Sequence, residues 1–214
     1  NIDQLSNGRF ILGIGVGYVE SEFTALNIPF KSRGKITDDY LEAMKNAWTQ
    51  ETVAHQSKFL SYSNIKISPK PIQKPHPPIW VGGNSIYAIK RAVIFESSWH
   101  PIEITKKWLH EKGLPLLQKI SIEHNKPIPQ ICPRILCQVY KEKLPEDSRR
   151  LGEGSINQIH EDLKFLDSIG AKYVIFDTKR YSKTSNLHTH HREAWRNFSM
   201  IVNKSLDLEN QRIR

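Results

Sequence analysis

The sequence predicts an α/β fold built on a mostly parallel sheet with right-handed crossover connections. Two observations indicate this class. Short apolar runs, typical of strands buried on both faces, alternate along the chain with amphipathic segments of helical period. No linker or low-complexity segment divides the 214 residues, so we expect one domain over residues 1–204 and a polar tail over 205–214.

Five strands are expected in this style. The first, "FILGIGV" (10–16), is a near-continuous apolar run. The second, in "PPIWVGG" (77–83), follows two prolines that fix an extended backbone and donate no hydrogen bonds. The five predicted strands are residues 10–16, 79–82, 97–99, 131–140 and 172–177. A closed (β/α)8 barrel needs eight strands, and an open five-stranded sheet is the other arrangement that fits this pattern.

Amphipathic helices are expected between and after the strands. The predicted helices are residues 32–49, 85–95, 103–124, 155–170 and 189–202. Gly113 and Pro115 should break or bend the third of them, and Gly170 should close the fourth. Residues 53–68 alternate only loosely, which predicts a hairpin or excursion outside the strand-helix repeat.

Composition limits the classes of function. The formal net charge is +9, but the basic residues are spread in short pairs without a nucleic-acid-binding signature, so a solvated surface is favoured over an anionic-ligand site or nucleic-acid binding. The uncharged stretch at 10–19 is about half a membrane span and no leader opens the sequence, so we expect a cytoplasmic protein with no membrane contact. Cys132 and Cys137 are expected to be reduced, on opposite faces of one strand.

Glycine motifs end the first two strands. Gly82 and Gly83 lie at the carboxyl end of their strand, where bare backbone N–H groups can surround an anion and Asn84 or Ser85 can cap the next helix. The alternative is a tight strand-to-helix turn. In "GIGVG" (13–17) alternate glycines leave one strand face without side chains, which suits a flat ring. Close packing or a bulge is the alternative there.

Four successive stretches resemble motifs of the luciferase-like monooxygenase family, in particular its coenzyme F-420-dependent branch. They are "LSNGRFILGIGVGYVESEFTALNIPFKSRG" (5–34), "DDYLEAMKNAWT" (38–49), "PKPIQKPHPPIWVGGNSIYAIKRA" (69–92) and "SSWHP" (97–101), with a weaker match at 151–176. The resemblance implies a (β/α)8 TIM barrel with about five of its eight strands present, because Asn1 falls in the helix before the family's fourth strand. On this basis we expect an N-terminally truncated chain.

The same resemblance implies a flavin- or deazaflavin-dependent oxidoreductase or monooxygenase. Hydride transfer or oxygen activation would take place at FMN or coenzyme F-420 and act on a small-molecule substrate, in a protein that we expect to form homo-oligomers. The implied contacts are Gly15, Gly17 and Tyr18 beside the ring, and Gly82, Gly83, Asn84 and Ser85 at the phosphate. The alternative is a non-catalytic remnant that retains the phosphate site.

For each of the other candidate residues, a structural or solvent-exposed role is the alternative to a functional one. Trp99 and His100 end the third strand, where Trp99 could contact the cofactor ring and His100 could transfer a proton; a structural or solvated histidine is the alternative. The "HTHH" stretch (188–191) lacks a spaced acidic or cysteine partner, so no metal site is predicted. Arg33 could pair with Glu22 near the site, but a structural clamp is favoured.

Overall fold

The computed structural model describes residues 1–178, 187–210 and 212–213. Its centre is a row of short parallel strands. Strand β1 (Leu12–Ile14) pairs with β4 (Ile79–Gly82), and β4 pairs on its other side with β5 (Ser98–His100). These are the first three strands that the sequence predicts.

The row continues through two isolated parallel bridges, Trp99 with Ile131 and Ile102 with Arg134. They join β5 to the segment of β6 (Arg134–Leu136), which pairs in parallel with β9 (Ile175–Asp177). The spatial order is therefore β1, β4, β5, β6, β9, the order of the chain. Within the described residues this row does not close into a barrel.

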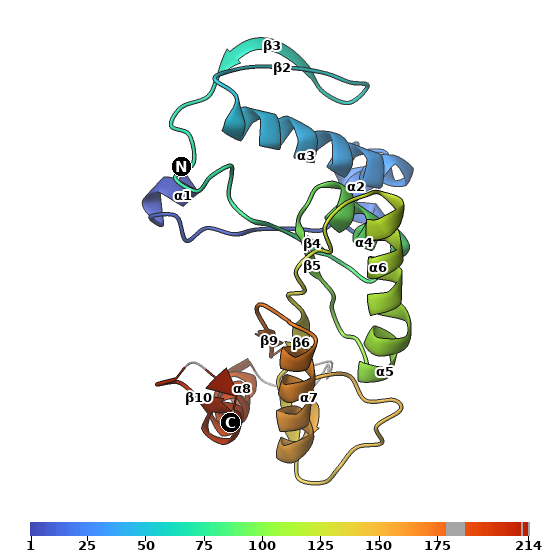
Figure 1. Cartoon of the computed structure of the whole chain (residues 1–214), viewed down its shortest axis with the longest axis vertical. Coiled ribbons are helices and arrows are strands. Elements are labelled where there is room, and N and C mark those ends of the chain that lie inside the picture. Colours follow the sequence, from blue (N-terminus) through green and yellow to red (C-terminus); the bar gives the residue numbers. More distant parts are fainter. Residues whose placement is uncertain (179–186, 211, 214) are drawn as a thin grey trace.

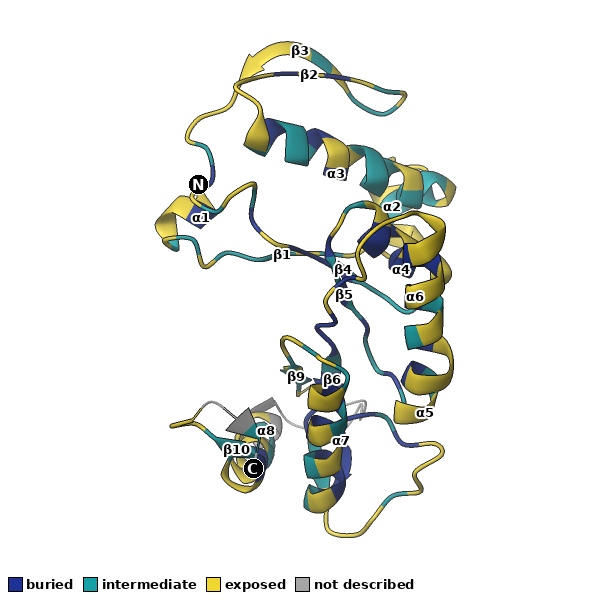
Figure 2. Ribbon diagram, in the orientation of Figure 1, coloured by how far each residue is buried: buried dark blue, intermediate teal, exposed yellow. Residues whose placement is uncertain are grey.

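Helices cover one face of the row. Figure 1 shows α4 (Ile86–Ile94) and α6 (Leu114–Glu123) to one side of β4 and β5, and residues of α7 (Ile156–Ser168) join the same hydrophobic core. The buried residues gather where these helices meet β4, β5 and β6 (Figure 2). The apolar side chains that the strands direct to the helices include Ile79, Val81, Trp99, Ile131 and Ile135. We call the opposite face of the row, turned away from α4, α6 and α7, the open face.

The long helix predicted at 103–124 begins later and contains the expected irregularity. Thr105 caps α5 (Lys106–Trp108) by accepting a hydrogen bond from the Trp108 N–H. A π-helical turn (Leu109–Gly113) follows and leads into α6. A Cβ atom at Gly113 would lie 3.0 Å from both Trp99 and Trp108, so the glycine lets the helix pack against these indoles. Pro115 has no N–H for the helix ladder, which is consistent with the irregular turn before it.

The single strand predicted at 131–140 is wrong. The chain divides there into β6 and β7 (Gln138–Tyr140), and β7 pairs in parallel with β8 (Glu153–Ser155). The division occurs because the Leu136 N–H donates to the Leu151 carbonyl, 2.9 Å away, so another segment crosses the strand at this point. Both cysteines on this stretch are free and buried, as expected, but they lie outside β6 and β7, so the expectation that they occupy opposite faces of one strand is wrong.

The C-terminal part carries more structure than the sequence indicates. Helix α8 (Leu187–Ser205) is followed by β10 (Leu206–Asp207) and β11 (Arg212–Ile213), which pair as antiparallel strands. Leu206 and Ile213 pack against the core, so the segment expected as a polar tail is a short hairpin. None of the helices in the described ranges is long and apolar enough to cross a membrane.

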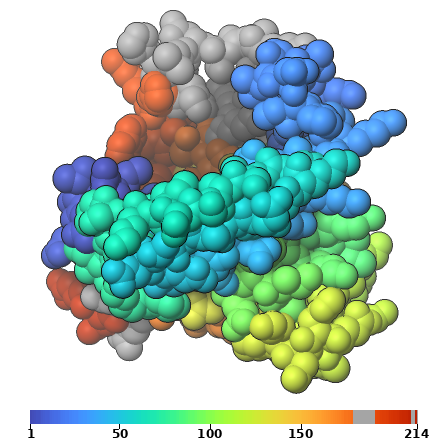
Figure 3. Space-filling model, turned by 90° about the horizontal axis from the view of Figure 1, so that it is seen from above, coloured from blue at the N-terminus to red at the C-terminus, as the bar shows by residue number. Residues whose placement is uncertain are grey.

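The N-terminal part builds a layer outside the strand row. Its elements are α1 (Ile2–Leu5), α2 (Glu20–Ala25), a 3-10 turn (Phe30–Ser32), α3 (Arg33–Thr49), β2 (Thr52–Gln56) and β3 (Ser61–Lys66). The excursion predicted at 53–68 is confirmed as the antiparallel hairpin β2–β3, which lies over α3 on the outside of the molecule (Figure 3). Asp39 of α3 holds it by accepting hydrogen bonds from His55 and Ser57.

Candidate cofactor and active site

The strand register shows which side chains share the open face. Gly13 is level with Trp80, and Gly82 is level with His100. Side chains alternate along a strand. Because Val81 belongs to the helix-side core, its neighbours on β4 face the opposite way. Trp80 and His100 therefore meet on the open face, where their ring centroids are 5.5 Å apart.

The alternate glycines of β1 leave this face bare. A Cβ atom built at Gly13 or at Gly15 would meet nothing within 4 Å. Gly17 is different: its φ of +78° and a Cβ that would lie 2.7 Å from the Phe23 ring make glycine a requirement of the turn. The predicted bare strand face is confirmed, and close packing does not explain Gly13 and Gly15.

Arg33 holds the turn that follows β1. Its Nε donates to the Gly17 carbonyl at 3.1 Å, and a second guanidinium nitrogen donates to the Phe30 carbonyl at 3.0 Å. The guanidinium carbon also lies 3.9 Å from the centroid of the Phe30 ring. The prediction that Arg33 is a structural clamp is confirmed. Tyr18, next to the clamped carbonyl, is 84% exposed and has no role in this turn's packing.

Both backbone polar groups of Gly83, the N–H and the carbonyl, are held by hydrogen bonds. Its φ is +117°, and a Cβ atom there would lie 3.3 Å from the Ala88 side chain, so glycine is required. Its N–H donates to the His100 carbonyl at 3.2 Å, and its own carbonyl accepts from the Trp99 indole at 2.8 Å. The Gly83 N–H is thus already engaged, which corrects the expectation that it would contact a phosphate.

The donors that can bind an anion start one residue later. Ser85 caps α4 by accepting from the Ala88 N–H, and the Asn84 side chain exchanges two hydrogen bonds with the backbone of Ile102. Within the described part of the chain, the backbone N–H groups of residues 84–87 have no hydrogen-bond partner. The start of α4 therefore offers a group of unpaired N–H donors beside the open face.

Trp99 lies behind this turn and not on the open face. Its side chain is 0% exposed, belongs to the helix-side core and has its ring centroid 6.2 Å from that of Trp108. Direct contact between Trp99 and a ring on the open face, which the sequence predicts, does not fit this orientation. Its indole N–H donates instead to the Gly83 carbonyl.

His100 is half-buried on the open face with a defined tautomer. Its Nδ1 lies 2.5 Å from the Cys132 carbonyl. A carbonyl only accepts, so Nδ1 carries the proton and Nε2 of the neutral ring has a free lone pair. Burial lowers the pKa of His100 and the positive charge of Arg134 lowers it further, whereas the hydrogen bond to Cys132 raises it. The net effect favours a neutral imidazole that can accept a proton at Nε2.

The structure adds polar residues to the open face that sequence reasoning missed. Arg134 of β6 and Asp177 of the neighbouring strand β9 form an ion pair, with Nε 3.3 Å from Oδ2, although Asp177 is level with Leu136 in the register. Tyr173 packs on Trp80 with ring centroids 5.3 Å apart. One signal was present in the sequence: Arg134 precedes the core residue Ile135, so alternation places the arginine on the opposite face.

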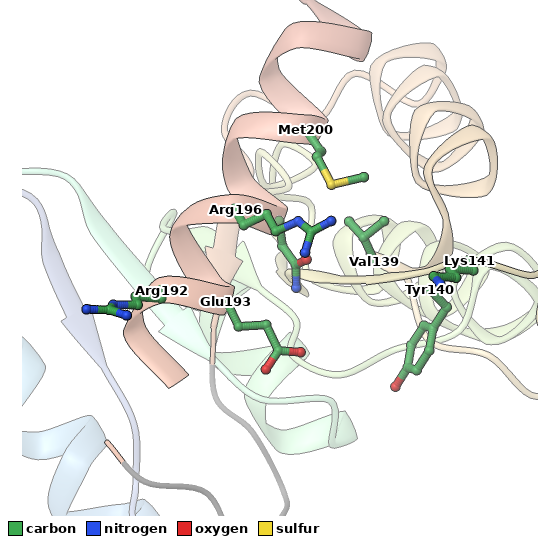
Figure 4. A pocket seen from close by; sticks show the side chains of 8 residues that line it. Val139, Tyr140, Lys141, Arg192, Glu193, Arg196 and Met200 are labelled. Atoms are coloured by element: carbon green, nitrogen blue, oxygen red, sulfur yellow. The ribbon is translucent and has the colours of Figure 1, made fainter. Parts of the chain in front are cut away.

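Among the described residues, neither a metal-ligand cluster nor the cavity beside α8 adds a residue to this group. No set of three or more His, Cys, Asp or Glu side chains suited to a metal occurs in the described ranges, and the side chains of residues 188–190 lie outside them. A cavity of about 440 Å³ separates β7 from α8, where Arg196 extends toward Val139 beneath Met200 (Figure 4). None of the predicted site residues lines it.

Comparison with known proteins assigns the family. The sequence model of the luciferase-like monooxygenase family matches residues 1–108. The chain belongs to this family. An FMNH(2)-dependent dimethylsulfone monooxygenase of Pseudomonas putida is 32% identical over 87 residues, which are 39% of this chain and 24% of that protein. The chain thus matches about a quarter of the length of such curated relatives.

Two solved structures share the fold with this luciferase-like chain at low sequence identity. The oxygenating constituent of 3,6-diketocamphane monooxygenase from Pseudomonas putida, in complex with FMN, has a TM-score of 0.69 and 13% identity, covering 95% of this chain and 71% of that one. The coenzyme F420-dependent tetrahydromethanopterin reductase from Methanopyrus kandleri has a TM-score of 0.66 and 12% identity, covering 80% and 69%. The chain carries part of the strand set of the luciferase-like TIM barrel.

Proposed function

We propose that this chain binds FMN or coenzyme F-420 on its open face and serves as an oxidoreductase of the luciferase-like class. The ring lies against Gly13 and Gly15, and the phosphate lies at the N–H groups of residues 84–87. One observation carries the proposal: a strand face bare enough for a flat ring adjoins a helix start with unpaired N–H donors. FMN- and F420-dependent relatives support the choice of cofactor.

The residues at the start of α4 fit a phosphate group. Helix α4 has nine residues, and its N-terminal dipole adds about 0.3–1 kcal/mol for an anion near the surface. Most of the affinity must therefore come from several N–H bonds acting together. The Ser85 cap, the Asn84 bonds to Ile102 and the two bonds of Gly83 hold these donors in place without side-chain movement.

His100 is the proposed proton-handling residue. The bound cofactor supplies the redox chemistry, hydride transfer or oxygen activation, and the chain supplies orientation and proton transfer. With Nδ1 fixed on the Cys132 carbonyl, Nε2 can accept a proton from a substrate hydroxyl held on the open face. Trp80 packs on the His100 ring and Tyr173 packs on Trp80, so aromatic rings line this part of the open face.

A second candidate is a cofactor-binding module without turnover. It is favoured by the open row of strands, which leaves the site uncovered on the side of β1 away from β4. The two candidates share the binding site and differ in catalysis.

The test is a titration of the chain with FMN and, separately, with coenzyme F-420, in which binding is measured by the fluorescence of the cofactor. We expect saturable binding of one of them and competition by its phosphate-bearing fragment. Turnover with a small-molecule substrate would then separate the enzyme from the module. If neither cofactor binds a chain whose circular dichroism shows it to be folded, the proposed function is wrong.

A further inference from the structure

Arg134 occupies the open face next to the proposed proton acceptor. The bridge between Ile102 and Arg134 brings β6 alongside the segment that follows His100. His100 is tied to the same segment, because its Nδ1 donates to the carbonyl of Cys132, two residues before Arg134. In the strand order, Arg134 stands three strands from β1, roughly 14 Å at about 4.8 Å per strand. It therefore lies on the same face as the glycines proposed to hold the ring, three strands away from them.

The guanidinium of Arg134 is incompletely bonded. Its Nε is buried and has no hydrogen-bond partner, and the contact of 3.3 Å with Asp177 lacks hydrogen-bond geometry. Across the described residues, the Arg134 side chain makes no hydrogen bond. The side chain is 35% exposed and that of Asp177 is 17% exposed, so the pair is accessible from the open face. Although it is ion-paired with Asp177, the guanidinium keeps a planar, partly buried fork of N–H donors without a hydrogen bond, and such a fork matches a carboxylate.

We infer that Arg134 binds a carboxylate of the substrate and that the open face selects aromatic or unsaturated carboxylates. This inference rests on the proposed function for its reaction, but not for the binding site itself. The rings of Trp80 and Tyr173 provide a flat apolar wall that suits the body of such a substrate. His100 lies on the same side, so a substrate held by Arg134 would present its reacting end between Nε2 and the cofactor.

Asp177 makes it possible to predict whether a substitution raises or lowers the affinity for a carboxylate. Its carboxylate lies close to the same guanidinium and competes with any incoming anion. Removing the Asp177 charge should therefore strengthen carboxylate binding, whereas removing the Arg134 charge should weaken it. A merely structural ion pair predicts no gain of affinity in either variant.

The experiment measures binding of benzoate, with benzamide as the neutral probe of the same shape, by calorimetry at pH 7 with and without FMN. In wild-type chain we expect benzoate to bind and benzamide to bind at least tenfold more weakly. Arg134→Gln should lower benzoate affinity at least tenfold, Arg134→Lys should retain part of it, and Asp177→Asn should raise it. Arg192→Gln, which removes the same charge from an exposed site on α8, should change nothing.

Equal binding of benzoate and benzamide, or equal losses in Arg134→Gln and Arg192→Gln, would overturn the inference. If thermal denaturation shows that Arg134→Gln is not folded at the temperature of the assay, the other two variants decide the question. Arg134→Lys should then lower the affinity for benzoate, and Asp177→Asn should raise it. FMN titration of the same proteins separates the two ideas. Benzoate binding that depends on Arg134 in a chain that binds no cofactor would uphold the anion site and remove the proposed function. Cofactor binding without benzoate binding would do the reverse.

Discussion

The indole nitrogen of Trp99 donates a hydrogen bond to the carbonyl oxygen of Gly83, 2.8 Å away. The Gly83 N–H in turn donates to the carbonyl of His100, the residue after Trp99. Two adjacent strands are thus tied together where both of them end, at the turn that starts α4. The core on the helix side and the candidate site on the open face are coupled through one glycine.

Trp99→Phe tests this coupling. The phenyl ring fills most of the indole volume but cannot donate, so the Gly83 carbonyl loses its partner. We expect the free energy of unfolding to fall by about 1–3 kcal/mol and FMN affinity to fall with it. Urea unfolding and fluorescence titration provide the measurements. Trp108→Phe is the matched control, since that indole contacts Trp99 without bonding the turn; equal effects of the two changes would deny Gly83 its special role.

Ile86→Asp tests the phosphate position. Ile86 is an exposed residue in the first turn of α4. An acidic side chain there stabilises the helix by about 0.3–1 kcal/mol but repels a bound phosphate. We therefore expect cofactor affinity at least tenfold lower, about 1.4 kcal/mol, in a protein that melts no earlier than wild type. Ile86→Asn has nearly the same shape without the charge and should bind almost normally. Equal affinities of the two variants would place the phosphate elsewhere.

Gly15→Val tests the ring position. Its new side chain would project into open space, so the chain should fold normally. We expect binding of the whole cofactor to weaken at least tenfold, about 1.4 kcal/mol, while a phosphate-only fragment binds as before. Gly17→Val is the contrasting change, because its side chain would collide with Phe23 and its φ is positive. That variant should unfold at a lower temperature. If Gly15→Val lowered the affinities for the cofactor and for the fragment equally, the glycines would serve the packing of the strand and not the binding of the ring.

The positions of the first three strands and the bare face of β1 could be predicted because both depend on local sequence pattern. Alternating glycines determine one face of a strand whatever packs nearby, and Ser85 caps α4 for the same local reason. The orientation of Trp99 could not be read so simply. Its neighbour His100 is equally plausible as the buried residue until the packing of Trp108 and Gly113 is known.

The sequence pattern could not predict which residues meet when strands that are far apart in the sequence pair with each other. Arg134 and Asp177 are 43 positions apart, and only the pairing of β6 with β9 brings them together, as diagonal neighbours, since Arg134 itself is level with Ile175. The break after Leu136 has the same origin, because β6 ends where the Leu136 N–H donates to the carbonyl of Leu151, in a separate loop. Hydrophobic periodicity carries no information about such a crossing segment.

The protonation of His100 gives a further prediction. Its pKa should lie below the ordinary 6.5, because burial and then the charge of Arg134 disfavour the imidazolium. Arg134→Gln removes one of these causes, so the pKa should rise toward 6.5. The other groups near the ring are Cys132, whose own pKa is raised by burial, and Asp177, which faces Arg134. Titration of the His100 Cε1 proton signal by NMR measures the shift in both proteins.

The same depressed pKa fixes the sign of a stability effect. The unfolded chain binds the His100 proton more readily than the folded chain, so the contribution of His100 to stability is present above about pH 6.5. It is lost as the pH falls through 6.5 toward the lower folded value. His100→Asn should reduce this acid-side slope of the unfolding free energy. A His100 pKa that does not move in Arg134→Gln would contradict the proximity on which the anion site depends.

The edges of the strand row lead to the last prediction. Strand β1 pairs only with β4 and β9 only with β6 among the described strands, so each presents one unpaired edge. Exposed backbone N–H and carbonyl groups on such edges favour pairing with another chain.

We expect the 214-residue chain to self-associate. Its apparent mass, measured by size-exclusion chromatography with light scattering, should rise with protein concentration. Gly13→Lys should shift it toward monomer, since the lysine projects into open space and places a charge on the edge. Ile122→Lys adds the same charge on the exposed side of α6 and should not. A concentration-independent monomer in the wild type would show that these edges are protected in solution.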